Sequence, residues 1–372
     1  MSDRIFKYEP LWGEWSVESL VGEGTFGKVY RLSKMQNGEK AFSVAKIIHV
    51  PILEADSLRF SDAGLSDAQI REMFSSAVSK LARDVERFTS RRPMANIVNY
   101  LDASIETDAD GGWDILLHME ELTPLTALLD GNKLTVRDVV RIGQEISNAL
   151  AQLSRVHVVH ADVKPENIFM TRFGSFKLAD IGIASNLRSV CPAAEDRVSR
   201  LYMAPEVDRG QPYDASCDIY SLGVLLYRLL NKNRLPLMDP QPGDLGAQDV
   251  NDAVEKRLAG AEIAELPLPV SRSIAAAVSS MIRYAQQSRV ADAAQLKQSF
   301  DDLYLFETDL DSQCETAQGS ALYKAARPPL KEEGEAMAYA AAAALPEEGS
   351  AQMPISSASP DAETPHAEEE NA

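Results

Sequence analysis

The chain lacks long hydrophobic runs and an evident targeting signal. Among its 372 residues no run of about 18 or more apolar residues occurs, and the longest candidate, AMAYAAAAAL from Ala336, is too short and too rich in alanine to span a membrane. The N-terminal stretch MSDRIFKYEP has no basic start followed by an apolar run, so it does not resemble a secretory signal. We therefore expect a cytoplasmic protein without a membrane span.

Cysteine and positive charge are also scarce. The three cysteines, Cys191, Cys217 and Cys314, lack the spacing of metal ligands and do not predict a disulfide framework. The 37 basic residues are outnumbered by 56 acidic ones, and the net charge of −19 argues against a non-specific nucleic-acid binder. From residue 311 onward, 12 acidic and 3 basic side chains give a net charge of −9, so the preceding part is only moderately acidic.

The N-terminal third of the chain is rich in strand patterns. Alternating apolar residues at 15–34, interrupted by a Gly-rich turn, predict a strand–turn–strand unit, and Val and Ile continue the sheet at 40–50. Two further strands are expected at 97–106 and 113–122. Before these two strands, a capping Ser or Asp followed by apolar residues at helical spacing predicts a helix over 66–88.

The rest of the chain has helical patterns and a polar end. The expected helices lie at 135–155, which begins at a Thr cap, and at 218–230, 270–285 and 292–306. From about residue 307 the bias toward Glu, Ala, Ser and Pro predicts a disordered tail. A strand-rich half followed by a helical half predicts an α+β fold with a ligand site between the halves.

A Gly-rich turn and a lysine point to phosphate binding. Gly22, Gly24 and Gly27 have the G-x-G-x-x-G-x-V spacing, and a strand pattern follows them. Because a Cβ would obstruct the approach of backbone to phosphates, this arrangement favours a hairpin that covers a nucleotide, although a structural turn is the alternative. Lys46 lies on the next strand, 19 residues after Gly27, where phosphates would supply its anionic partner. A lysine on an exposed strand edge is the alternative interpretation of that residue.

Several motifs together resemble those of eukaryotic-type Ser/Thr protein kinases, a family that is also widespread in bacteria. HADVKPEN (160–167) matches the catalytic loop, DIG (180–182) the metal-binding motif, and YMAPE (202–206) the end of the activation segment. DIYSLG, from Asp218, is similar to the buried helix that follows. The resemblance covers roughly residues 14–306, with the motifs in the family's order.

The resemblance implies a bilobal kinase-like fold. A small β-rich N-lobe with one main helix is expected at about 14–120, and a larger helical C-lobe at about 121–306. Residues 1–13 form a flank before this domain, and 307–372 form the acidic tail. The composition supports no nucleic-acid partner, and the oligomeric state stays open.

The same resemblance assigns chemical roles. The protein would transfer the γ-phosphoryl group of ATP, with Mg²⁺, to Ser or Thr hydroxyls of protein substrates. Asp162 would accept or orient the proton of the attacking hydroxyl, and Lys164 would neutralise charge on the transferred group. Asn167 and Asp180 would supply hard oxygen ligands to the metal, while Lys46 would bind the α- and β-phosphates.

The implied nucleotide pocket is larger than this set. The residues expected to form it, in chain order, are Val21, Gly22, Gly24, Gly27, Val29, Ala45, Lys46, Met119, Glu120, Leu122, Phe169 and Asp180. Val29, Ala45 and Phe169 would hold the adenine ring between them. Met119 would gate the back of the pocket, and the backbone groups just after it would meet the adenine edge.

Other motif residues are expected to be structural. We expect His160 to be buried beneath the metal motif and not to act as a base. Asp218 would cap the backbone of the catalytic loop. Glu206 would pair with Arg289 in a buried ion pair, whose disruption costs about 3–5 kcal/mol in comparable cases.

The acidic partner of Lys46 is ambiguous. Two candidates lie on the helix before Asn96: Asp84, which fits the apolar spacing, and Glu86, which keeps the longer side chain expected in the family. An aspartate is one methylene shorter, so the helix would have to lie closer to the sheet. The side-chain length narrowly favours Glu86.

The activation segment departs from the family pattern. Ala161 replaces the Arg that precedes the catalytic Asp and that, in most relatives, contacts a phosphate on this segment. Because that Arg contacts neither magnesium nor the hydroxyl, we expect active chemistry without this mode of control. Ser199 stands where a Thr bonds the catalytic residues and favours Ser/Thr substrates. Arg200 replaces a Pro, and it either attracts acidic side chains of the substrate or is simply an exposed Arg.

The leading hypothesis is therefore a Ser/Thr protein kinase. A pseudokinase that holds nucleotide or partners without catalysis is the alternative, although Lys46, Asp162, Asn167 and Asp180 are all present. A small-molecule kinase of the aminoglycoside or choline type shares the Asp and Asn of the loop, but such enzymes generally lack the APE motif and the Gly-rich loop.

Overall fold

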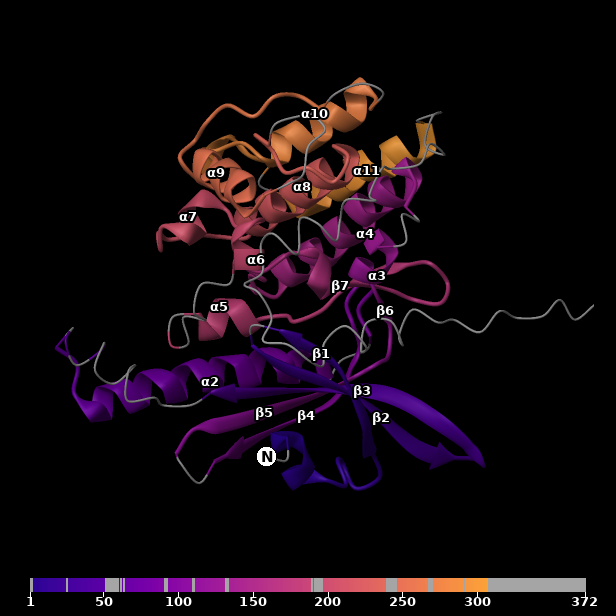
Figure 1. Cartoon of the computed structure of the whole chain (residues 1–372), viewed down its shortest axis with the longest axis vertical. Coiled ribbons are helices and arrows are strands. Elements are labelled where there is room, and N and C mark those ends of the chain that lie inside the picture. Colours follow the sequence, from indigo (N-terminus) through magenta and orange to yellow (C-terminus); the bar gives the residue numbers. More distant parts are fainter. Residues whose placement is uncertain are drawn as a thin grey trace, which may run out of the picture.

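The structure is a computed structural model of the chain with two halves. It describes residues 3–24, 26–50, 60, 62, 64–89, 93–108, 111–130, 134–188, 190, 197–238, 246–266, 270–290 and 292–306. A β-sheet and one long helix form the N-terminal half, and helices form most of the C-terminal half, as Figure 1 shows. The expected α+β, bilobal fold is confirmed.

The N-lobe is built on a five-stranded antiparallel sheet with the order β1-β2-β3-β5-β4. Its elements are β1 (Ser16–Gly24), β2 (Gly27–Gln36), β3 (Glu39–Val50), α2 (Asp67–Thr89), β4 (Tyr100–Thr107) and β5 (Trp113–Met119). Helix α2 begins after Ser66, whose hydroxyl and backbone N–H both bond the side chain of Gln69. The reciprocal bond from the Gln69 backbone N–H to the Ser66 hydroxyl completes a cap at this helix end.

Each face of this sheet is covered by a different part of the chain. On one face, α2 buries Phe74, Leu81 and Val85 in the main core. On the other face, Ile5, Leu11 and Trp15 join a second apolar cluster with residues of β2 and β3. The N-terminal flank therefore contributes to the folding of the N-lobe, although the sequence assigned it no structural role.

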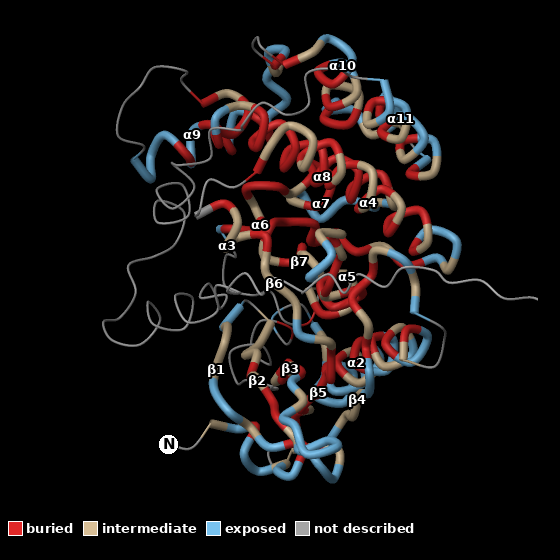
Figure 2. Tube along the Cα trace, turned by 90° about the vertical axis from the view of Figure 1, so that its right-hand side faces the viewer, coloured by how far each residue is buried: buried red, intermediate tan, exposed pale blue. Residues whose placement is uncertain are grey.

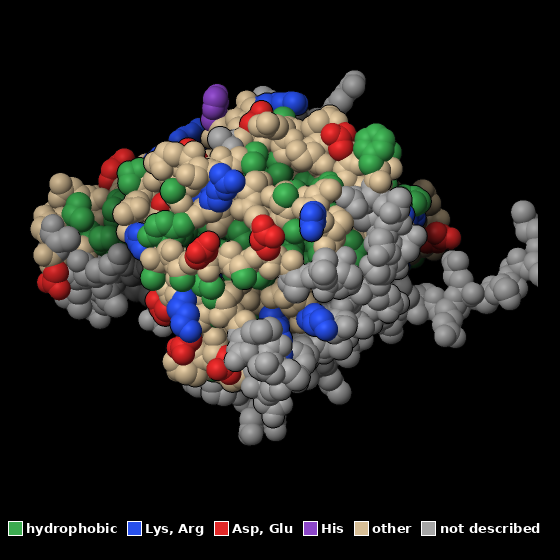
Figure 3. Space-filling model, turned by 90° about the horizontal axis from the view of Figure 1, so that it is seen from above, with side chains coloured by type: hydrophobic (Ala, Val, Ile, Leu, Met, Phe, Trp, Pro, Cys, Tyr) green, Lys and Arg blue, Asp and Glu red, His purple; other side chains and the backbone are tan. Residues whose placement is uncertain are grey.

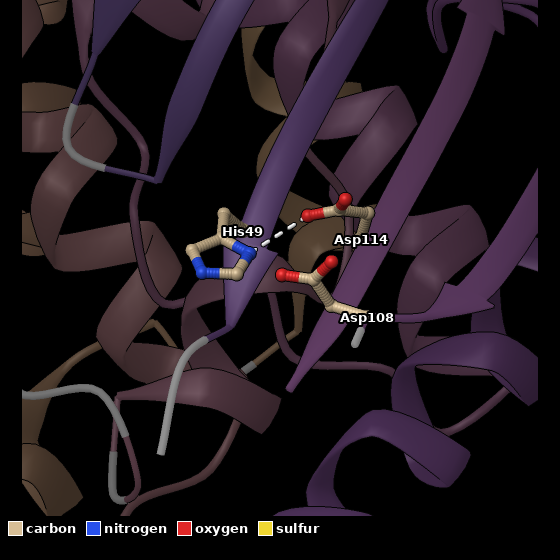
Figure 4. A group of neighbouring side chains, drawn as sticks. All are labelled: His49, Asp108 and Asp114. Carbon is tan, nitrogen blue, oxygen red and sulfur yellow. Dashed lines mark hydrogen bonds and ion pairs between the residues drawn. The ribbon is translucent and has the colours of Figure 1, made fainter. Parts of the chain in front are cut away.

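Charged groups fix the flank to the sheet edge. In the short helix η1 (Arg4–Tyr8), Arg4 lies 2.5 Å from Asp108, and Lys7 lies 2.7 Å from Asp114. Asp114 also bonds His49 at 2.7 Å, and Figure 4 shows His49, Asp108 and Asp114 grouped at this edge. Burial opposes the ionisation of Asp114, but the bonds from Lys7, Tyr8 and His49 outweigh it and lower its pKa. Because the chain's own cations already neutralise these carboxylates, the cluster serves as an anchor for the flank.

The C-lobe is helical around a fully buried central helix. Its elements are α3 (Leu125–Asp130), α4 (Val136–Arg155), η2 (Pro165–Asn167), α5 (Ile183–Leu187), α6 (Arg197–Arg200), α7 (Pro205–Asp208), α8 (Ser216–Leu230), α9 (Ala247–Leu258), α10 (Arg272–Met281), η3 (Gln286–Ser288) and α11 (Ala293–Phe306). Every residue of α8 is buried, and Figure 2 shows α8 beside α4 at the centre of this lobe. Helix α4 begins at the expected cap, where Thr135 and Asp138 exchange bonds.

A small three-stranded sheet positions the catalytic segments. It has the order β6-β7-β8, with β6 (Thr123–Pro124), β7 (Ile168–Met170) and β8 (Phe176–Leu178). Because β7 and β8 form a hairpin, the segments just before β7 and just after β8 lie at the same end of it. A parallel bridge from Ile97 to Leu178 joins this hairpin to the segment before β4.

The surface carries charges of both signs. Seen from the C-lobe end in Figure 3, Lys and Arg side chains are interspersed with Asp and Glu. Within the described ranges, no helix is long and apolar enough to cross a membrane.

Candidate active site

The catalytic loop is held from below by a buried aspartate. Asp218, 1% exposed, accepts bonds from the backbone N–H groups of His160 (2.8 Å) and Ala161 (2.7 Å). Burial raises the pKa of Asp218, and the nearby His160 ring and the two backbone N–H groups oppose that rise. His160 is fully buried, and its Nε2 lies 2.6 Å from the carbonyl oxygen of Ala179, directly before the DIG motif. Both residues have the structural positions that the sequence predicted.

Three side chains surround the carboxylate of Asp162. The Ser199 hydroxyl donates to Oδ1 at 2.5 Å, and the Asn167 amide donates to Oδ2 at 3.1 Å. Lys164 lies 3.1 Å from the same Oδ2 and donates to the Ser199 hydroxyl at 2.6 Å. The two residues from the catalytic loop and the one from the activation segment thus orient a single carboxylate, as the sequence predicted for Ser199.

A contact between the two lobes completes the group. Lys46 of β3 is 5% exposed, and its Nζ lies 2.5 Å from Oδ2 of Asp180, which follows β8. The amide nitrogen of Asn167 donates a hydrogen bond to Asp162. Its amide oxygen is the atom that a hard cation would use, and Asp180 adds a carboxylate nearby along the β7–β8 hairpin. The donor set of Asn167 and Asp180 therefore fits Mg²⁺.

The end of the activation segment is anchored by two buried arginines. Arg289 forms a bidentate pair with Glu206, at 2.5 and 2.8 Å, as expected from the sequence. Arg257 of α9 is 1% exposed and donates to the carbonyl groups of Arg200, Leu201 and Met203, at 2.8–3.1 Å. The sequence analysis missed Arg257, since nothing in its local pattern separates it from a surface arginine of an amphipathic helix.

The glycines of the β1–β2 hairpin have distinct surroundings. A Cβ added to Gly24 would meet nothing within 4 Å, whereas one added to Gly27 would overlap the carbonyl oxygen of Ile47. Gly27 also has a φ of +156°, which side-chain-bearing residues rarely adopt. Gly24 is therefore available for the approach of a ligand, while Gly27 is required for the packing of β2 on β3.

The expectation for Ala45 is wrong. Side chains alternate along β3, so Ala45 lies opposite to Lys46 and belongs to the outer apolar cluster with Ile5 and Trp15. Val44 shares the face of Lys46 and pairs across the sheet with Met119. The β3 side chain that shares the face of Lys46 is therefore Val44, one residue earlier than the sequence-based assignment.

The segment after β5 contains the residues that the sequence analysis assigned to the gate and to the adenine edge. Met119, the last residue of β5, is 5% exposed and belongs to the main core. The backbone N–H of Glu120 donates to the carbonyl of Asn99, and the Glu120 side chain accepts from Lys177 at 2.5 Å. The carbonyl of Glu120 and the backbone of Leu122 are the groups that a ligand could meet here. Phe169 of β7 and Val29 of β2 are both partly buried, on opposite lobes.

Comparison with known proteins agrees with this geometry. Residues 15–300 match the protein kinase domain, which is more than half of the chain. The chain belongs to the protein kinase family.

Similar curated kinases are longer proteins. This kinase is 30% identical over 219 residues to serine/threonine-protein kinase 36 of Pongo abelii, a match that covers 58% of this chain and 14% of the relative. It is 24% identical over 243 residues to serine/threonine-protein kinase shk2 of Schizosaccharomyces pombe (65% of this chain, 37% of the relative). A probable serine/threonine-protein kinase of Clostridium perfringens is 31% identical over 137 residues (36% and 20%). The chain thus spans well under half the length of these relatives.

The sequence narrowly favoured Glu86 over Asp84 as the α2 partner of Lys46, and the described part of the structure does not show that pair. Glu86 is exposed. The carboxylate of Asp84 accepts a bond from Asn186 in α5 at 2.8 Å, and its side chain lies beside Gly182 of the metal motif. Asp84 is therefore the α2 acid that faces the kinase site, and the observed ion pair of Lys46 is with Asp180.

Arg200 of the activation segment forms ion pairs within the chain. Arg200 lies 2.7 Å from Asp208 and 2.5 Å from Glu255, so its charge is neutralised within the chain. The acidic residues Glu195 and Asp196 of this segment, and the lone Cys191, lie outside the described residues.

Proposed function

We propose that this chain is a Ser/Thr protein kinase that transfers the γ-phosphoryl group of ATP to protein hydroxyls. The observation that carries the proposal is the placement of two contacts at one end of the β7–β8 hairpin: Lys46 lies 2.5 Å from Asp180, and Asn167 bonds Asp162 at 3.1 Å. Family membership and the names of the relatives support it.

The residues have complementary tasks in this reaction. The acceptor hydroxyl gives its proton to, or is oriented by, Asp162, because this carboxylate is fixed by donors on both oxygens. Lys164 stands beside it and stabilises charge on the phosphoryl group in transit. Lys46 leaves Asp180 to bind the nucleotide phosphates. Asn167 and Asp180 would hold Mg²⁺, which neutralises phosphate charge when bound.

The absence of an Arg at position 161 concerns control of the enzyme. Ala161 presents only backbone groups, and Asp218 and Arg188 bond them. We propose that activity does not depend on a phosphate clasped from this position. Ser185→Ala and Ser189→Ala should each retain activity, and abolition by either would contradict this part of the proposal.

Labelled ATP tests the function directly. Purified protein is incubated with Mg²⁺, radiolabelled ATP and a generic basic protein. Label transferred to protein, and lost with Asp162→Asn, is the expected result. Nucleotide binding without transfer would favour the alternative, a nucleotide-binding scaffold in which the Lys46–Asp180 pair persists. Transfer to an aminoglycoside or choline, but not to protein, would indicate a small-molecule kinase.

Two further parts of the proposal have their own tests. We place the catalytic domain at residues 14–306 and treat 307–372 as a separate acidic tail. Limited proteolysis can test whether cleavage occurs at the boundary between the two. We also propose a cytoplasmic location, which cell fractionation would test.

A further inference from the structure

The outer face of the N-lobe sheet is covered by residues 3–15, which we call the strap. Figure 1 shows this indigo segment on the side of the sheet away from α2. Buried apolar side chains of the strap and of strands β2, β3 and β5 form one cluster. Its members are Ile5, Leu11, Trp15, Tyr30, Leu32, Ala45, Ile47 and Leu116. The strap is therefore a packed layer of the lobe.

The cluster lies directly behind Lys46. Ala45 and Ile47, the neighbours of Lys46 along β3, both belong to it, together with Ile5 of the strap. Lys46 points to the opposite face, where its Nζ lies 2.5 Å from Asp180. Because packed side chains yield little, a shift of β3 at the outer face also moves this lysine. The position of the residue expected to bind phosphates thus depends on what packs behind it.

The strap also contacts the base of the Gly-rich hairpin. Asp3 lies 3.3 Å from Lys28, the residue after Gly27. The ring of Phe6 meets the ring of Tyr30 edge-on, with centroids 6.5 Å apart. Both contacts are made to β2 within three residues of Gly27. The same segment that backs the lysine therefore also holds the strand that leaves the hairpin.

Charged groups fix the strap at the far edge of the sheet. Arg4 lies 2.5 Å from Asp108, and Lys7 lies 2.7 Å from Asp114. The hydroxyl of Tyr8 donates to the Asp114 carboxylate at 2.6 Å. Since Asp114 is fully buried, it depends on this counter-charge, and the contact is a strong anchor. The strap is thus fixed both at the β4–β5 edge and at the hairpin.

We propose that the strap positions the nucleotide-binding part of the site by holding β2 and β3 at the hairpin and at Lys46. The inference rests on the proposed kinase function, because it takes ATP with Mg²⁺ as the ligand. A lysine and a covering hairpin bind phosphates more tightly when their geometry is fixed before the ligand arrives. The strap supplies that geometry from the opposite face of the sheet. It acts on nucleotide affinity, whereas the acceptor side, with Asp162 and Ser199, belongs to the C-lobe.

The substitution Ile5→Ala tests the strap, because it removes an apolar contact behind β3 and keeps the charged anchors. We expect the dissociation constant of ATP with Mg²⁺ to rise by roughly 3- to 10-fold, as for other substitutions that act on a site from a distance. The KM for a protein substrate should stay the same. Calorimetric titration of the full chain, at a temperature where circular dichroism shows each variant folded, measures the constant. Ile5→Val keeps most of the side chain and should restore the affinity. An unchanged constant in Ile5→Ala would overturn the proposal.

The matched control is a buried isoleucine of the other lobe. Ile274 of α10 is 2% exposed and belongs to the main core. Ile274→Ala removes the same atoms as Ile5→Ala, so it should lower the melting temperature but leave the affinity for ATP unchanged. Equal losses of affinity in the two variants would assign the effect to general destabilisation and overturn the role of the strap.

A second readout needs neither nucleotide nor catalysis. Hydrogen–deuterium exchange of the amides at 27–30 and 45–47 should be faster in Ile5→Ala than in wild type and in Ile274→Ala. Equal exchange in all three proteins would overturn the strap even if each of them is an active kinase. Faster exchange in Ile5→Ala, in a chain that transfers no phosphoryl group, would retain the strap and overturn the kinase assignment.

Discussion

Arg289 and Glu206, which are 83 positions apart in sequence, form a buried bidentate ion pair in which each residue is at most 6% exposed. The pair joins the end of the activation segment to the loop before α11. Because either charge alone would be stranded inside the C-lobe, we expect Glu206→Gln to lower the free energy of unfolding by about 3–5 kcal/mol. Denaturant unfolding monitored by circular dichroism measures this change.

The exposed pair of Glu14 and Lys34 is the control for that prediction. These side chains lie 2.7 Å apart at the surface, so Glu14→Gln should leave the unfolding midpoint unchanged. Equal effects of the two substitutions would contradict the role assigned to burial.

The two glycines Gly24 and Gly27 should respond differently to alanine. Gly27→Ala places a Cβ on the Ile47 carbonyl and should destabilise the N-lobe by about 1–3 kcal/mol. Gly24→Ala meets open space, so the melting temperature should stay the same while nucleotide affinity falls. Thermal unfolding and nucleotide titration on both variants separate the two roles. Similar melting temperatures for both would show that β2 and β3 can adjust.

Ser199 should matter for rate more than for stability. Ser199→Ala removes the hydroxyl that connects Lys164 to Asp162, and bonds of this type to charged groups contribute about 1.5–3 kcal/mol. We expect transfer to slow by roughly 10- to 100-fold. Ser199→Thr retains the hydroxyl and should keep most of the activity. A full-rate Ser199→Ala enzyme would show that Lys164 orients Asp162 without this bridge.

Stability should depend on pH through His118. Burial lowers the pKa of His118 to about 4, while nearby Asp102 opposes the shift. Its ring stacks on Trp12 and bonds the Ser43 hydroxyl. The unfolded chain binds a proton on this histidine near pH 6.5, whereas the folded chain does not. The contribution of His118 to the free energy of unfolding is therefore fully present above pH 6.5. It is lost as the pH falls toward 4, by up to about 3 kcal/mol.

The neutral variant His118→Gln isolates this effect. Glutamine can keep the bond to Ser43 but does not titrate in this range. Unfolding free energies measured between pH 4 and pH 7 should therefore fall less steeply for the variant than for wild type. Parallel curves would assign the acid sensitivity to other groups.

The grouping of the candidate catalytic residues could be predicted from sequence because most of them lie close together along the chain. Asp162, Lys164 and Asn167 lie in the segment before β7, and Asp180 lies two residues after β8, so the β7–β8 hairpin brings them together. The buried helix α8 and the cap at Thr135 are likewise determined by short-range patterns.

The errors in the sequence-based assignments arise at residues whose orientation is determined by tertiary contacts. Neighbouring residues of a strand point to opposite faces of the sheet, so an assignment that is one position off selects the wrong face. For this reason the predicted pocket contained Ala45 and not Val44. The preference for Glu86 depended on side-chain length, whereas the rotation of α2 turns Asp84 toward the site. Arg257 binds three carbonyls that are distant in sequence, which no local pattern reveals.

The outer face of the nucleotide-binding sheet is already occupied by the chain's own beginning. Ile5, Leu11 and Trp15 fill it, and Arg4 and Lys7 neutralise the carboxylates at its edge. Any regulator that addressed this face of the sheet would have to displace those residues or bind on top of them. Shortening the protein to its family-matched core would uncover that apolar surface and leave Asp114 buried without its counter-charge.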